Sequence, residues 1–155
     1  AAYSVGVSGR EGQLALYARQ QAAGVPNAWG ADVHYVSHTN ASSNGKAQGC
    51  HPMYYTYSKN GKKLGEIMVK YRKQIYPRTV KLVPRADPYE LKNTNAVAFY
   101  KEHAFHDNPE DATWFHTHMK EIAESAAKGL CEYFGIPYVK VTKRGDGTGT
   151  WELVR

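Results

Sequence analysis

Runs of strand-forming residues alternate with helical patterns along this chain, and the alternation limits its fold more than any other feature. Residues 31–38 and 94–105 are rich in β-branched and aromatic side chains. Between these two runs, apolar residues recur at helical spacing and predict a helix with one apolar face, which ends before Pro77. These residues are Leu64, Ile67, Met68, Tyr71 and Ile75. Strands that alternate with helices predict an α/β fold, a three-layer sandwich in which helices flank a largely parallel sheet.

Two shorter segments extend this pattern. Residues 12–23 carry apolar side chains at helical spacing, and they predict a short helix that ends at Gly24. Residues 48–57 return to strand composition. The run 31–38 lies between Gly30 and a polar loop, and we interpret it as a buried strand.

The last helix has the clearest boundaries in the sequence. Asn108 is a good N-cap residue, Pro109 suits the first helical position, and Gly135 suits the position after the last turn. We therefore predict one helix that begins at Pro109 and ends just before Gly135. The predicted domain covers residues 1–136, and residues 137–155 form a tail that is either an added hairpin or a linker.

Composition restricts the class of partner. The 155 residues carry a formal charge of +6, which favours a polyanion such as nucleic acid, an anionic membrane or a bacterial wall. The sequence has none of the common nucleic-acid-binding patterns, so we expect no nucleic acid, and no apolar run approaches the length of a membrane span. Cys50 and Cys131 fit no CxxC spacing and predict two buried thiols, with one disulfide as the alternative.

Two side chains that suit metal binding and proton transfer lie near the ends of predicted strands. His38 ends the first strand and Glu102 lies late in the strand 94–105. Ligands of open α/β sheets bind outside the carboxyl ends of the strands. A neutral imidazole binds zinc well, and a carboxylate beside a metal takes a proton from water. A lone histidine is more often structural, but a glutamate among apolar residues needs a partner or a function.

Two segments carry a resemblance to a known family. Residues 30–42 (GADVHYVSHTNAS) and residues 94–111 (TNAVAFYKEHAFHDNPED) resemble two motifs of the zinc-dependent N-acetylmuramoyl-L-alanine amidases of type 3, in the family's order. The resemblance extends over about residues 19–134. It implies that His38 is a zinc ligand and that Glu102 is the catalytic carboxylate.

The resemblance also implies a substrate and a location. These amidases use zinc-activated water to cleave the amide bond between N-acetylmuramic acid and L-alanine in peptidoglycan. Residues 1–136 would then form the catalytic domain, with peptidoglycan as the partner. The protein is expected to be secreted or bound to the cell wall, or to lie in the host cytoplasm before lysis if a phage encodes it.

The sequence departs from the family in its metal ligands. The family binds zinc through His, Glu and His, and the first two of these precede the part that the resemblance covers. Residues 1–24 contain one acid, Glu11, and it lies too close to His38 to be the family's glutamate ligand. We therefore expect the first βα unit and the other ligands upstream of residue 1. A degenerate, metal-free domain that binds the cell wall is the alternative.

The other candidate residues have weaker signals. Asn40, in the first motif, and His106, near Glu102, are predicted to contact substrate. His116 and His118 are two apart on a helix and point to different faces, so they are not expected to form a metal pair. The remaining histidines flank the predicted strands and are expected to pack or to line the rim: His34, His51 and His103.

Overall fold

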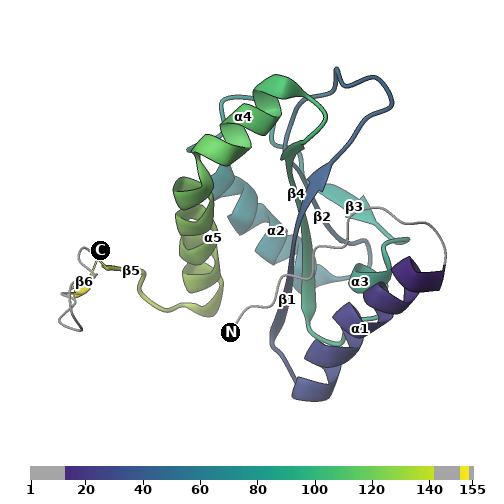
Figure 1. Cartoon of the computed structure of the whole chain (residues 1–155). Helices are drawn as coiled ribbons and strands as arrows, with labels where there is room; N and C mark the ends of the chain where they lie inside the picture. Colours follow the sequence, from purple (N-terminus) through teal and green to yellow (C-terminus); the bar gives the residue numbers. More distant parts are fainter. Residues whose placement is uncertain (1–12, 142–150, 154–155) are drawn as a thin grey trace, which may run out of the picture.

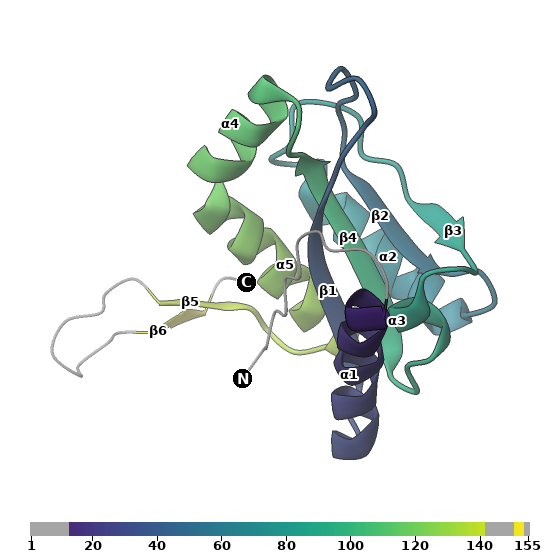
Figure 2. The same cartoon turned by 45° about the vertical axis from the view of Figure 1, so that its right-hand side comes forward.

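The computed structural model of the protein describes residues 13–141 and 151–153. The strands are β1 (Val33–Asn40), β2 (His51–Tyr55), β3 (Val83–Arg85), β4 (Val97–Phe105), β5 (Val139–Val141) and β6 (Trp151–Leu153). The helices are α1 (Gln13–Trp29), α2 (Lys59–Arg72), α3 (Tyr89–Lys92), α4 (Pro109–Thr117) and α5 (Met119–Phe134). Figures 1 and 2 show their arrangement.

A four-stranded sheet with the order β1-β4-β2-β3 forms the centre of the molecule. Two of its pairings are parallel, β1 with β4 and β2 with β3, whereas β2 runs antiparallel to β4. Because of this direction, the first residues of β2 lie beside the last residues of β4. In the predicted tail, β5 pairs antiparallel with β6.

Helices cover both faces of this sheet. Helices α2 and α5 lie on one side, and α1 and α3 lie on the other (Figures 1 and 2). On the α2 side, Leu64, Met68 and Phe99 form a buried cluster, against which Leu130 and Tyr133 of α5 pack. The predicted α/β fold with three layers is confirmed.

The first helix is longer than the sequence predicts. Helix α1 continues through Gly24 and Pro26 and ends at Trp29. Its last turn is held by the side chain of Asn27, whose amide donates to the Asn93 carbonyl at 2.8 Å and whose oxygen accepts from the backbone N–H of Asn95 at 2.7 Å. The prediction that Gly24 ends this helix is wrong, because these long-range bonds outweigh the weak helical propensity of glycine.

The predicted last helix is two helices, α4 and α5, that meet at His118. The hydroxyl of Thr117 donates to the carbonyl oxygens of Thr113 and Trp114, and the His118 ring stacks on Trp114 and bonds to its carbonyl. Such local side-chain bonds compete with the backbone ladder of a helix. The predicted N-cap is confirmed, since Asn108 accepts from the N–H groups of Glu110 and Asp111.

The exposure of β1, the state of the two cysteines and the character of the helices are also predicted from the sequence. Strand β1 is half-buried rather than fully buried, because it pairs along one edge only among the described residues. Cys50 is a buried thiol and Cys131 is a partly exposed one, and both are free. No helix in the described part of the chain is long and apolar enough to cross a membrane.

One buried carboxylate joins four separate segments. Asp111 is fully buried, and its Oδ2 accepts from the backbone N–H groups of Gly49 and Phe105, each at 3.0 Å. Its Oδ1 accepts from the Tyr76 hydroxyl at 2.6 Å and from Arg78 at 3.4 Å. The residue therefore ties the segment before β2, the end of β4 and the segment after α2 to the first turn of α4.

We expect Asp111→Asn to destabilise the fold by roughly 2–4 kcal/mol, because an amide keeps the size but turns one acceptor into a donor that faces buried donors. Urea unfolding at pH 7 measures this change. Glu110→Gln is the matched control, since the neighbouring Glu110 also bonds Arg78 but is 70% exposed. Equal stability of the two variants would contradict the role of Asp111 as a hub.

Candidate functional site

His38 and Glu102 meet across the parallel pair of strands. They are register partners of β1 and β4, and Nδ1 of His38 lies 3.1 Å from Oε2 of Glu102. The His38 side chain is 45% exposed, whereas the Glu102 side chain is 9% exposed. The hydrogen bond to Glu102 raises the pKa of His38, although partial burial opposes this shift. The glutamate in its apolar strand therefore has a partner, and the histidine keeps a surface open to solvent.

The register between β1 and β4 shifts directly after this pair. His38 is opposite Glu102, but Asn40 is opposite Phe105, so β4 has one extra residue there. Bulges of this kind re-aim side chains and are common beside active sites. Here the shift turns both His103 and Ala104 toward α4, where the His103 ring lies 5.6 Å from that of Phe115. Glu102 points to the opposite face of the sheet, which α3 covers.

Behind the pair, His103 links the two strands to α2. Nη2 of Arg72 donates to Nδ1 of His103 at 2.6 Å, so the proton of the ring lies on Nε2, which donates to the Ser37 hydroxyl at 2.9 Å. Burial, and then the nearby Arg72, lower the pKa of His103 well below the usual value. His103 is thus a neutral core residue that holds the segment next to His38. This placement agrees with the packing role expected from the sequence.

Two cations lie buried on the α2 face of the sheet. Arg72 and Lys101 are both fully buried. Among the described residues, Nζ of Lys101 and the Nε and Nη1 atoms of Arg72 have no hydrogen-bond partner. Burial, and then the charge of Arg72, lower the pKa of Lys101 to about 7. Local sequence patterns do not predict that Lys101 is buried, because strand alternation puts it in the core only once the neighbouring strands are known.

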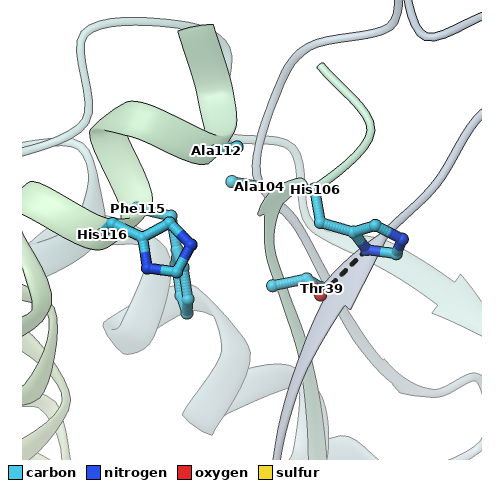
Figure 3. A pocket seen from close by; sticks show the side chains of 6 residues that line it. All are labelled: Thr39, Ala104, His106, Ala112, Phe115 and His116. Carbon is cyan, nitrogen blue, oxygen red and sulfur yellow. Dashed lines mark hydrogen bonds between the residues drawn. The ribbon is translucent and has the colours of Figure 1, made fainter. Parts of the chain in front are cut away.

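His106 and Asn40, the predicted substrate-binding residues, lie beyond the register shift. The N–H of His106 donates to the Asn40 carbonyl at 2.9 Å, and Nδ1 of His106 lies 3.1 Å from the Thr39 hydroxyl. Thr39 and His106 form one wall of a hollow of about 240 Å³, and Phe115 and His116 of α4 form the other (Figure 3). Because Thr39 and His38 point to opposite faces of β1, this hollow does not open onto Glu102.

The remaining histidines are divided between the two faces. His34 is half-buried near Glu90, on the same face as Glu102. His116 lines the hollow, whereas His118 stacks on Trp114. His51 is directly opposite Glu102 in the antiparallel pair of β2 and β4. Sequence reasoning missed this proximity, because register between distant segments has no local signal.

The described residues can be tested for their fit to a zinc ion. A zinc ion that is held tightly needs three or four protein ligands. Half-exposed His38 beside a carboxylate has the chemistry of one ligand, but no three His, Cys, Asp or Glu side chains of the described residues lie together in a way that would hold a metal ion. Within these residues the fit to zinc is therefore incomplete.

The buried Lys101 makes the stability of the fold depend on pH. Between its folded pKa of about 7 and its unfolded value of 10.5, the unfolded chain binds more protons, so this residue makes stability rise with pH across that window. We expect Lys101→Met to stabilise the protein at pH 7 and the gain to shrink toward pH 9.5 or so. Urea unfolding at several pH values measures the difference. The control Lys120→Met changes an exposed lysine and should show no such trend.

Solved structures of known proteins share this fold. The catalytic domain of CwlV, an N-acetylmuramoyl-L-alanine amidase from Bacillus (Paenibacillus) polymyxa var. colistinus, is 22% identical with a TM-score of 0.69, covering 76% of this chain and 66% of that one. The N-acetylmuramoyl-L-alanine amidase from Clostridium difficile 630 is 21% identical with a TM-score of 0.66, covering 76% and 65%. AmiC2 of Nostoc punctiforme, also such an amidase, is 19% identical with a TM-score of 0.68, covering 75% and 65%.

These likenesses establish the fold, and the chain spans just under two thirds of the length of these relatives. No curated protein matches the sequence significantly. The family comparison is more direct, because the sequence profile of the N-acetylmuramoyl-L-alanine amidase family matches residues 6–132, most of the 155 residues and both motifs around His38 and Glu102. The chain therefore belongs to the N-acetylmuramoyl-L-alanine amidase family.

Proposed function

We propose that the protein hydrolyses the amide bond between N-acetylmuramic acid and L-alanine in peptidoglycan. The observation that carries this proposal is the His38–Glu102 pair, 3.1 Å apart at the carboxyl edge of two parallel strands, in a chain of the amidase family. An imidazole and a carboxylate at such an edge have the chemistry for amide hydrolysis by an activated water.

Glu102 is the proposed general base. Its carboxylate takes a proton from the attacking water and later gives a proton to the leaving amine of the peptide. Its side chain is 9% exposed, and a carboxylate in such a dry site interacts more strongly with nearby charge than one in water. Its hydrogen bond to His38 fixes the direction in which the carboxylate points.

Zinc is the proposed cofactor, with His38 as one ligand and the other ligands outside the described residues. When bound, zinc would lower the pKa of the attacking water and polarise the amide carbonyl. The half-exposed ring of His38 offers the lone pair that such an ion needs. Asn40 and His106 remain predicted substrate contacts; since His106 lines the α4 side, any contact it makes is with a part of the substrate away from the reacting amide.

Peptidoglycan is the proposed partner, and the charge of the chain suits it. A formal charge of +6 keeps the protein near the acidic polymers of a bacterial wall, and this attraction weakens as salt screens it. The proposed location is outside the cell or at the wall, or the host cytoplasm before lysis if the source is a phage.

Glu102→Gln tests the general base. The amide keeps the size of the side chain but does not accept the proton, so release of stem peptide from purified peptidoglycan should fall by about 10²–10⁴-fold in the whole protein supplied with zinc. Thermal stability and zinc content should change little. A variant that cleaves at the wild-type rate, and is merely less stable, would mean that Glu102 is a structural residue.

His38→Ala tests the metal ligand. We expect the whole wild-type protein to bind about one zinc per chain and the variant to lose most of it, because a site with one ligand fewer holds zinc weakly. Atomic absorption after dialysis measures the metal, with Glu102→Gln as the control that keeps its zinc. Full zinc content in His38→Ala would remove this residue from the site.

A further inference from the structure

Three side chains form one row across the centre of the sheet. His38 of β1 is the register partner of Glu102 in β4, and Glu102 is the register partner of His51 in β2. Residues directly opposite one another project to the same face, with Cβ atoms about 4.5–5.5 Å apart. Glu102 thus lies between two histidines in this row, one on each neighbouring strand.

The two imidazoles differ in what they bind. His38 makes its hydrogen bond to Glu102, but the His51 ring has no hydrogen-bond partner among the residues that the structure describes. Packing holds the His51 ring instead. It meets Phe105 edge-on, with ring centroids 5.5 Å apart, and a Cβ on Gly49 would lie 3.1 Å from its Nε2. These contacts hold the ring in place, and neither of its nitrogens is used in a hydrogen bond to another described residue.

The surroundings of His51 favour the neutral ring. Partial burial, and then the positive charge of Lys81, lower its pKa, and these effects exceed the opposing influence of Glu102 and Asp111. A neutral imidazole has one N–H donor and one acceptor nitrogen. Near pH 7, His51 therefore offers a hydrogen-bond donor that carries no charge of its own.

We propose that His51 is a substrate-contacting residue whose N–H donates a hydrogen bond to the oxygen of the scissile amide carbonyl. This inference rests on the proposed function. Water activated by Glu102 attacks the carbonyl carbon, and negative charge then develops on the carbonyl oxygen. A fixed donor one strand away from the base lies within reach of that oxygen. The contact involves no net transfer of the His51 proton.

Two substitutions at His51 separate donor from shape. His51→Phe keeps a ring against Phe105 but has no N–H, and we expect kcat on purified muropeptide to fall about 10²–10³-fold with little change in KM. His51→Gln restores an N–H donor and should recover most of that loss. The control His34→Phe removes a half-buried histidine from the same face of the sheet, and its kcat should match the wild type. Melting curves of all three variants establish that they are folded.

A second measurement does not need turnover. N-acetylmuramic acid carries the carboxylate that hydrolysis leaves on the sugar, and its addition should shift the ring C–H signal of His51, but not that of His34, in NMR spectra of the wild-type protein. Equal kcat in wild type and folded His51→Phe, or a His51 signal that N-acetylmuramic acid leaves in place, would overturn the inference. If the wild type cleaves no muropeptide, the proposed function fails, and the NMR shift alone decides whether His51 contacts this sugar.

Discussion

The hydrogen bonds of the buried Asp111 carboxylate determine how the sheet is arranged where β2 begins and β4 ends. It accepts hydrogen bonds from the backbone at Gly49 and Phe105 and from the side chain of Tyr76, and so satisfies donors that would otherwise be buried without partners. An unpaired carboxylate in such a place would be costly, whereas a fully bonded one joins segments far apart in the sequence. The start of β2 and the end of β4 are thereby fixed relative to each other.

This constraint determines the geometry of the candidate site. Since Gly49 and Phe105 are held by one carboxylate, His51 and Glu102 are brought to the same edge of the sheet. The neighbouring Asp107 holds the loop after β1, accepting from the N–H and the hydroxyl of Ser42. The segment before that loop contains His38. Three strand ends are thus positioned by bonds in which the side chains of His38, His51 and Glu102 take no part.

The two faces of the sheet have different roles around Glu102. On the α3 side lie the buried carboxylate of Glu102, the half-exposed ring of His38 and the side chain of His51. On the α2 side, Arg72 and Lys101 are buried without a carboxylate partner among the described residues, which is unfavourable for stability. Proteins commonly accept a local loss of stability near functional sites when the rest of the structure compensates for it. Here the apolar cluster beside α2 and α5 lies next to these two cations.

The sequence alone determined the α/β class, the N-cap at Asn108, and the two motifs that single out His38 and Glu102, because caps, hydrophobic periods and motifs are local patterns. It failed where distant segments decide the outcome. Asn27 extends α1 by bonding residues 93 and 95, and local bonds at His118 divide the last helix. Only the tertiary structure decided that His51 lies beside Glu102 and that Lys101 faces the core. A shift of one residue in strand register reverses which face every side chain occupies, and register is fixed by pairing between segments that the sequence leaves far apart.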